Sequence, residues 1–280
     1  MSISNNIYYH CSSLIGLRQK NEDEILVIEN IDSSIPEFCS VNSYSVFDGH
    51  GGDKISKFLK DKYGKYILNK KFIDEIDKSK KSNKKIKLLY EAMQKNITDL
   101  NMASRYCGST ALTCIVYGEN NKYLKIINLG DCRAVACNEN NIAIALTKDH
   151  RPDSYEELKR IKKLGGVVEY SKDDDPRIDG MSVSRSLGDL DSKPYISHNP
   201  DIYDYDSKKY SFIILACDGV WEVLKNQEAI DFVLSKLDEI KIDRNCKQKS
   251  KSNIANLLAE YALEKKSTDN LSVVIIFLDQ

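Results

Sequence analysis

The chain has 280 residues, enough for one large domain or two small ones with a substantial core. Its 41 basic and 42 acidic residues give a formal net charge of -1, which argues against a general affinity for nucleic acids or anionic membranes. No linker rich in Pro, Gly or Ser divides the sequence, so we expect one domain over residues 1–280.

Apolar runs of strand length recur along the chain, and stretches with helical periodicity lie between them. The expected strands cover residues 24–30, 44–47, 110–117, 122–129, 133–137, 142–146, 211–217 and 271–278. The expected helices cover residues 51–68, 84–104, 153–164, 226–240 and 251–265. The strands between 110 and 146 are joined by three or four residues, too few for a parallel crossover, which predicts an antiparallel meander.

Several expected strands, such as "FIILAC", are apolar at every position. Both faces of such a strand must be covered, and we expect a second sheet on one face and helices on the other. The sequence therefore predicts an α+β fold, a four-layer α-β-β-α sandwich of two antiparallel sheets flanked by helices.

The eight cysteines form no Cys-x-x-Cys pair and several lie in apolar runs, which predicts reduced packing thiols of an intracellular protein. The N-terminus has no signal-peptide core, and no apolar run approaches the roughly 18 residues that a membrane helix needs. We accordingly expect a cytoplasmic or nuclear monomer with no membrane or nucleic-acid partner.

Acidic residues lie at the ends of strongly apolar strands. They are Asp48, Asp131 and Asp218 after their strands, and Glu22, Asp23 and Asp269 before theirs. One such residue is typical of a turn or a helix cap. Several carboxylates on one rim would repel one another unless a cation lay between them. Mg²⁺ or Mn²⁺ fits oxygen ligands, and the sequence offers no His/Cys zinc spacing, so a shared metal cluster and ordinary turn residues remain as alternatives.

Nine ordered segments carry a family resemblance: "RQKNEDE" (18–24), "FDGHGG" (47–52), "GSTAL" (108–112), "NLGDCRAV" (128–135), "LTKDHRPD" (146–153), "GG.V" (165–168), "RIDGMSVSRSLGD" (177–189), "ACDGVWE" (216–222) and "STDNLSVV" (267–274). Together they resemble the signature segments of the metal-dependent Ser/Thr protein phosphatases of type 2C, the PPM family. The resemblance spans nearly the whole chain and implies the same four-layer sandwich.

The resemblance also implies roles for individual residues. Asp48 would bridge two metal ions, with Glu22 and the Gly49 carbonyl on one ion and Asp218 and Asp269 on the other.

Three further residues would act beside the two ions. Asp23 would contact metal-bound water, Arg18 would bind phosphate, and His50 would be the general acid. Asp131 corresponds to a ligand of a weaker third ion. The family usually carries aspartate at the position of Glu222, and glutamate is one methylene longer, so the resemblance implies two ions and leaves a third open.

The implied activity is hydrolysis of phosphoserine and phosphothreonine in proteins by hydroxide activated between two Mg²⁺ or Mn²⁺ ions. The chain contains no Cys-x5-Arg and no Asp-x-Asp-x-[Thr/Val] signature, which disfavours phosphocysteine and phosphoaspartate routes. The alternative is a catalytically weak phosphatase-like scaffold that binds phosphoproteins. A metal-dependent nuclease would need a basic track along the nucleic-acid backbone, which the neutral charge balance disfavours.

Other candidate residues are interpreted as structural. His150 is expected to order the loop before its helix, and Asp149, Arg185 and Asp189 are expected to fix loops, because short motifs such as "SRSLGD" often do so through salt bridges. The acidic stretch 173–175 lies in a segment that forms a flap beside the active site in the family. We expect it to favour basic phosphopeptides.

Overall fold

The computed structural model describes residues 7–31, 41–67, 76, 80–100, 107–172, 174–192, 194–245 and 253–278. The strands are β1 (Tyr8–Leu14), β2 (Glu24–Ile28), β3 (Asn42–Phe47), β4 (Gly49–His50), β5 (Gly108–Ser109), β6 (Ala111–Tyr117), β7 (Tyr123–Leu129), β8 (Arg133–Asn138), β9 (Ala143–Ala145), β10 (Leu187–Gly188), β11 (Asp201–Asp206), β12 (Tyr210–Ala216) and β13 (Leu271–Phe277). The α-helices are α1 (Lys54–Ile67), α3 (Lys80–Asp99), α4 (Tyr155–Lys163), α5 (Asp218–Trp221), α6 (Asn226–Asn245) and α7 (Ile254–Glu264).

Each expected strand and helix is present, with its ends shifted by a few residues. The expected helix over 84–104 is α3, and positions 68, 101–104 and 251–252 of the expected helices lie outside the described residues. Among the described residues, no helix is both long enough and apolar enough to cross a membrane. The described cysteines are free, and all of them except Cys11 are buried, as expected of packing thiols.

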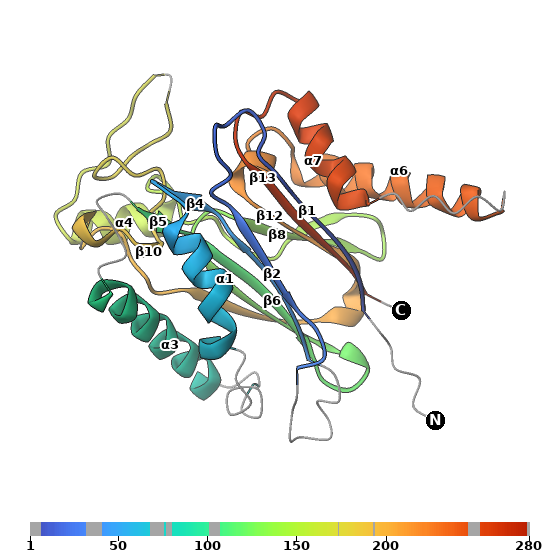
Figure 1. Ribbon diagram of the computed structural model, residues 1–280, viewed down its shortest axis with the longest axis horizontal. Coiled ribbons are helices and arrows are strands. Elements are labelled where there is room, and N and C mark those ends of the chain that lie inside the picture. The colour runs from blue at the N-terminus through green and yellow to red at the C-terminus, as the bar shows by residue number, and fades with distance from the viewer. Residues whose placement is uncertain are drawn as a thin grey trace.

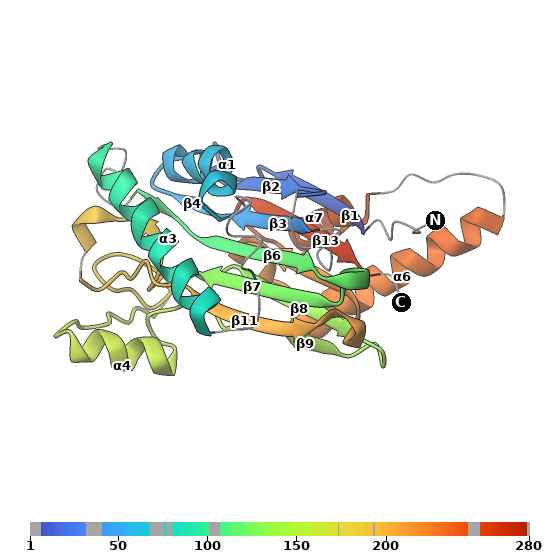
Figure 2. The same ribbon diagram turned by 90° about the horizontal axis from the view of Figure 1, so that it is seen from below.

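Two antiparallel sheets pack face to face in the middle of the molecule (Figure 2). The first has the strand order β1-β13-β12-β8-β9, and the second has the order β11-β7-β6-β3-β2. Helices α6 and α7 cover the outer face of the first sheet, and α1 and α3 cover the outer face of the second (Figure 1). The predicted four-layer α-β-β-α sandwich is therefore confirmed.

The side chains of β6 show why its sequence is apolar at nearly every position. Leu112 and Cys114 belong to the buried cluster that joins the two sheets. Ala111 and Ile115 point the other way, into the cluster that joins this sheet to α1 and α3. Because successive side chains of a strand face opposite sides of its sheet, a strand buried between two layers needs apolar residues in both registers.

The predicted meander over 110–146 is wrong at its middle connection. β6 pairs with β7 in the second sheet, whereas β8 pairs with β9 in the first. The three residues Gly130, Asp131 and Cys132 link the two hairpins across the sandwich. A link of this length reaches about 10 Å, which is roughly the spacing of packed sheets. This step between sheets places Asp131 at the end of the sandwich, between the layers.

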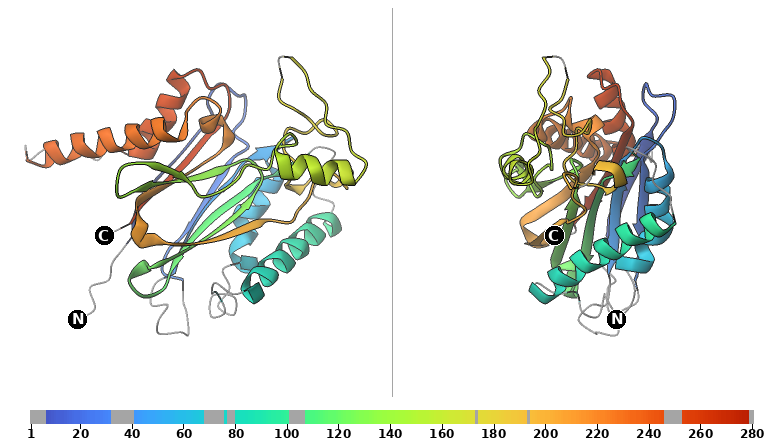
Figure 3. Two further views of the ribbon diagram at one scale, coloured as in Figure 1. Left: turned by 180° about the vertical axis from the view of Figure 1, so that it is seen from behind. Right: turned by 90° about the vertical axis from the view of Figure 1, so that its left-hand side faces the viewer.

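A third, smaller sheet with the order β10-β5-β4 lies at the same end of the molecule. Helix α4 and the segment that follows it, drawn in yellow-green and yellow, project beyond the ends of the large sheets there (Figures 1 and 3). These elements surround the place where the acidic strand ends meet.

Candidate metal-dependent active site

The predicted site residues lie together at one end of the sandwich because neighbouring strands run antiparallel. β3 and β12 end there, next to Asp48 and Asp218, whereas β2 and β13 begin there, next to Asp23 and Asp269. β2 pairs with β3 and β13 pairs with β12, so the start of one strand lies beside the end of its neighbour. A cleft of ≈ 630 Å³ opens at this point. The predicted residues that line it are Arg18, Glu22, Asp48, Gly49, His50, Asp131, Asp218 and Asp269.

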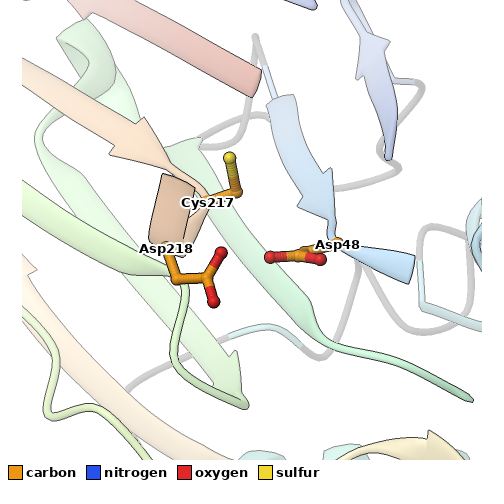
Figure 4. A group of neighbouring side chains, drawn as sticks. All are labelled: Asp48, Cys217 and Asp218. Atoms are coloured by element: carbon orange, nitrogen blue, oxygen red, sulfur yellow. The ribbon is translucent and has the colours of Figure 1, made fainter. Parts of the chain in front are cut away.

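Asp48 and Asp218 form the centre of the cleft. Donor atoms of Asp48, Asp218 and Cys217 all lie within 4.8 Å of one another. Figure 4 shows the two carboxylates facing each other while the Cys217 sulfur turns away from them. That thiol instead lies 3.4 Å from the carbonyl oxygen of Asn270, and it accepts a hydrogen bond from a backbone N–H of β13. The two aspartates therefore share the site without the sulfur.

Backbone contacts fix the segment that carries Asp48, and this segment packs closely against Glu22. The Asp48 N–H donates to Thr110 Oγ1 (3.0 Å), and the Asp48 carbonyl accepts from the Thr110 N–H (2.8 Å). Gly49 packs against Glu22 so closely that a Cβ on Gly49 would lie 2.3 Å from the Glu22 carbonyl oxygen. The absence of a side chain at Gly49 therefore allows the two ligand-bearing segments to meet.

Asn270 is a positioning residue that the sequence reasoning missed. Its Oδ1 accepts from the Glu22 N–H (2.9 Å), and its Nδ2 donates to the carbonyl oxygens of Ile15 and Lys20 (2.8 and 2.9 Å). One amide thus fixes the loop between β1 and β2 against the start of β13. The only signal in the sequence was its place beside Asp269 in "STDN".

The carboxylates at this end of the sandwich have too few hydrogen-bond donors and positive charges around them to stabilise their ionised forms. Asp48 and Asp131 each have a pKa well above the ordinary aspartate value. The main cause is removal from water, and the second is the negative charge of neighbouring Asp218. Burial and the charge of Asp269 likewise raise the pKa of Asp218. Burial, reinforced by Asp218 and Asp269, raises the pKa of Asp23 to about 7. Each shift shows that the ionised form lacks stabilisation.

Unsatisfied oxygen atoms point to the same conclusion. Both carboxylate oxygens of Asp131 and Oδ2 of Asp23 are buried and have no hydrogen-bond partner in the described part of the chain. Buried polar atoms in folded proteins nearly always have partners. A cluster of oxygen donors with excess negative charge fits hard divalent cations such as Mg²⁺ or Mn²⁺.

Arg18 supplies positive charge at the rim of the cleft. Its Nη2 donates to Asp269 Oδ2 at 2.7 Å, and its side chain is 57% exposed. An exposed pair of this kind is weak, typically below about 1 kcal/mol. Arg18 can therefore exchange its carboxylate partner for a phosphate group, which a guanidinium binds through two parallel hydrogen bonds.

His50 lies against a carboxylate that the sequence analysis had interpreted as a loop-fixing residue. Its Nε2 lies 2.8 and 3.0 Å from the two carboxylate oxygens of Asp189. The predicted structural roles of Arg185 and Asp149 are confirmed, because Arg185 pairs with Glu157 on α4 and Asp149 pairs with Arg133. Asp189, for which the same structural role was expected, contacts the candidate general acid.

His150, which was expected to order the loop before its helix, contacts the connection that carries Asp131. The Gly130 N–H donates to His150 Nδ1 at 3.0 Å, and His150 Nε2 lies 3.2 Å from Asp201 Oδ2. The imidazole thus joins the link between β7 and β8 to the start of β11. This contact helps to keep Asp131 at the cleft.

Glu222, at the position where the family carries aspartate, is a solvent-exposed residue near the acidic cluster and does not line the cleft itself. Partial removal of its carboxylate from water and the charge of Asp218 raise the pKa of Glu222 to about 7, with further contributions from Asp175 and Asp269. The side chain therefore lies within the electrostatic reach of the cluster. Asp131, Asp218 and Glu222 are the residues that could hold a further ion.

The described acidic residues of the flap next to the cleft form ion pairs with arginines of the same chain. Asp174 pairs with Arg177 (2.7 Å), and Asp175 pairs with Arg151, while residue 173 lies outside the described residues. Arg177 and Met181 from this segment line the cleft. The expectation that the acidic stretch favours basic phosphopeptides therefore gains no support, because two of its carboxylates already have basic partners.

Comparisons with known proteins point to one family. The family model described as protein phosphatase 2C matches residues 8–271. A PP2C-like domain-containing protein of Acanthamoeba polyphaga mimivirus is 43% identical over 171 residues, which cover 56% of this chain and 95% of that protein. Probable protein phosphatase 2C 45 of Oryza sativa subsp. japonica is 31% identical over 280 residues, which cover 99% of this chain and 89% of that protein.

A solved structure shows the same fold. The serine-threonine phosphatase 2C from Toxoplasma gondii superimposes with a TM-score of 0.79 at 23% identity, covering 98% of this chain and 95% of that chain. The arrangement of sheets and helices is thus shared over nearly the whole length of both chains.

Proposed function

Because this chain belongs to the protein phosphatase 2C family and is a metal-dependent serine/threonine phosphatase, we propose that two divalent cations in its cleft support hydrolysis of phosphoserine and phosphothreonine in proteins. The observation that carries this proposal is the facing pair of Asp48 and Asp218, surrounded by further carboxylates with unsatisfied oxygens. Phosphorylated proteins are the proposed substrates, and Mg²⁺ or Mn²⁺ are the proposed ions.

The residues of the cleft would divide the ions between them. Asp48, at the centre, would contact both. Glu22 and the Gly49 carbonyl would hold one ion, and Asp218 and Asp269 would hold the other. When bound, such a pair of ions lowers the pKa of a water molecule toward 7, making it a nucleophile, and neutralises the charge of the phosphate.

The remaining residues bind, orient and move protons. Arg18 would turn from Asp269 to the phosphate and hold it with parallel hydrogen bonds. Asp23 Oδ2, which has no partner in the described residues, would accept a hydrogen bond from the attacking water and orient it. His50, two residues from Asp48 on the wall of the cleft, would donate a proton to the departing serine or threonine oxygen, which is a poor leaving group as an alkoxide.

Phosphate release from a phosphothreonine peptide tests this proposal. Wild-type protein should be active with Mn²⁺ or Mg²⁺ and inactive with a chelator. Asp48→Asn and Asp218→Asn should each lower kcat/KM by at least about 100-fold, because each removes a ligand and a charge from the centre. Asp53→Asn is the matched control, since Asp53 does not line the cleft and its carboxylate pairs with Lys57 four residues along the chain.

Unchanged activity in either cleft variant would contradict the two-ion mechanism. A wild-type protein that binds the phosphopeptide but releases no phosphate under any metal condition would favour the alternative, a phosphatase-like scaffold.

A further inference from the structure

The small sheet at the mouth of the cleft brings three distant segments together around His50. His50 on β4 pairs with Gly108 on β5, and Gly108 pairs with Gly188 on β10. Asp189 follows directly after β10. This arrangement places the Asp189 carboxylate beside the imidazole ring, although 139 residues separate the two in the sequence.

Gly108 leaves the space in which these side chains meet. A Cβ on Gly108 would lie 2.3 Å from Asp189 Oδ2 and 2.7 Å from His50 Nε2. Any side chain at this position would therefore occupy the region of the His50–Asp189 contact. The middle strand of the small sheet thus has no side chain at the position where the imidazole of His50 meets the carboxylate of Asp189.

Several contacts fix Asp189 in place from its own side. The residue is 1% exposed and has a φ of 44°, in the left-handed region that non-glycine residues rarely adopt. Ser186 Oγ donates to its carboxylate, and its N–H donates to the Cys107 carbonyl at 3.0 Å. Gln94 on α3 holds the preceding backbone, donating to the Gly188 carbonyl (2.7 Å) and accepting from the Gly188 N–H (2.9 Å). The carboxylate is therefore held rigidly before any substrate binds.

We propose that Asp189 is the positioning residue for the general acid His50, a role that rests on the proposed phosphatase function. Its carboxylate accepts a hydrogen bond from Nε2–H and fixes both the rotation and the tautomer of the ring. Nδ1, which has no hydrogen-bond partner among the described residues, is then the atom that carries the transferable proton. The proton moves from Nδ1 to the leaving oxygen as the P–O bond breaks, and the Nε2–H bond to Asp189 stays in place.

The test compares two leaving groups in Mn²⁺-loaded enzyme. The alkoxide of a phosphothreonine peptide needs a proton, whereas p-nitrophenolate from p-nitrophenyl phosphate is stable without one. A correctly placed general acid contributes about 10²- to 10⁴-fold. Asp189→Asn, which keeps the shape of the side chain, should therefore lower the ratio of the phosphopeptide kcat to the p-nitrophenyl phosphate kcat by about 10- to 100-fold.

Two comparisons separate this role from a structural one. His50→Gln should lower the same ratio at least as much, and the double variant should be no worse than His50→Gln alone, because Asp189 acts through His50. Asp191→Asn, an exposed neighbour two positions along the chain, should keep the wild-type ratio. An Asp189 variant that slows both substrates equally, or that multiplies the effect of His50→Gln, would overturn the proposal.

A spectroscopic measurement on wild-type protein covers the case in which Asp189 variants do not fold. When the His50 ring is neutral, its long-range ¹H–¹⁵N spectra should show the Nε2–H tautomer, and an Nδ1–H tautomer would overturn the assignment. Absence of activity on both substrates in wild-type protein would contradict the proposed function itself. Wild-type activity combined with an unchanged ratio in the Asp189 variants would remove only the role of Asp189.

Discussion

Gly49→Ala tests how closely the metal-binding segments must approach. The new Cβ would lie 2.3 Å from the Glu22 carbonyl oxygen and 2.8 Å from Ser56 Oγ. Ordinary contact begins at 3.4 Å, so the Glu22 backbone must move away by about 1 Å. The φ of Gly49 lies outside the left-handed region, so the effect is steric rather than conformational.

The expected result has two parts. Overpacking of this size should reduce the free energy of unfolding by about 1–3 kcal/mol. A displacement of about 1 Å at the reacting groups should lower kcat by about 100-fold, and Mn²⁺ affinity should fall because Glu22 and the Gly49 carbonyl separate from Asp48. Isothermal titration with Mn²⁺, phosphate release and chemical denaturation measure the three quantities on the same preparation.

Gly64→Ala is the matched control. Gly64 lies inside α1, and its new Cβ would lie 3.0 Å from Cδ1 of Ile28, the movable end of a side chain. Alanine favours a helix over glycine by about 0.5–1 kcal/mol, so this variant should keep full activity and at least wild-type stability. A Gly49→Ala protein whose Mn²⁺ affinity and kcat match those of Gly64→Ala would refute the reasoning.

Two further changes test the electrostatics. Burial alone would raise the pKa of Glu157, but hydrogen bonds and charge from Arg185 and Arg160 outweigh burial and lower this pKa to about 2. Glu157→Gln should therefore reduce the free energy of unfolding by about 3 kcal/mol at pH 7. This loss should shrink as the pH falls below the ordinary glutamate value toward 2, and urea denaturation should show no such change for exposed Glu156→Gln. Arg18→Ala frees Asp269 from its exposed partner, so Mn²⁺ affinity should rise by up to about 5-fold while KM for the phosphopeptide increases; weaker Mn²⁺ binding in calorimetry would contradict this competition.

Most of the strands that the sequence predicted are those whose burial shows in their composition, although the edge strands β2 and β9 were predicted as well. "TALTCIVY" and "LSVVIIFL" are apolar in both registers because layers cover both of their faces. β1 (Tyr8–Leu14) and β11 (Asp201–Asp206) were missed, and both lie at sheet edges. Their residues are mostly half-buried, so polar side chains are tolerated and the apolar signal is weak.

The acidic residues of the site could be predicted for a related reason. Each follows or precedes a strong apolar run, and antiparallel pairing brings such ends together. The contacts of Asn270 and Asp189 could not be predicted this way, because they depend on how loops meet in space. The small sheet that carries His50 to Asp189 is built from two-residue strands, which are too short to leave a periodic pattern.

The connection between β7 and β8 illustrates a similar limit. Its length excluded a parallel crossover but did not distinguish a hairpin from a step to the facing sheet. That step is what places Asp131 at the cleft. The position of Asp131 at a strand end was therefore enough to predict that it lies near the other acidic residues, whereas the predicted topology of the connection was wrong.

The central claim is that one cleft binds two divalent cations around Asp48. Crystals grown with Mn²⁺ and measured at the manganese absorption edge test this most directly. The anomalous difference map should show two peaks beside Asp48, one next to Glu22 and the Gly49 carbonyl and the other next to Asp218 and Asp269. A fully occupied Mn²⁺ site elsewhere, with no peak at Asp48, would contradict the account.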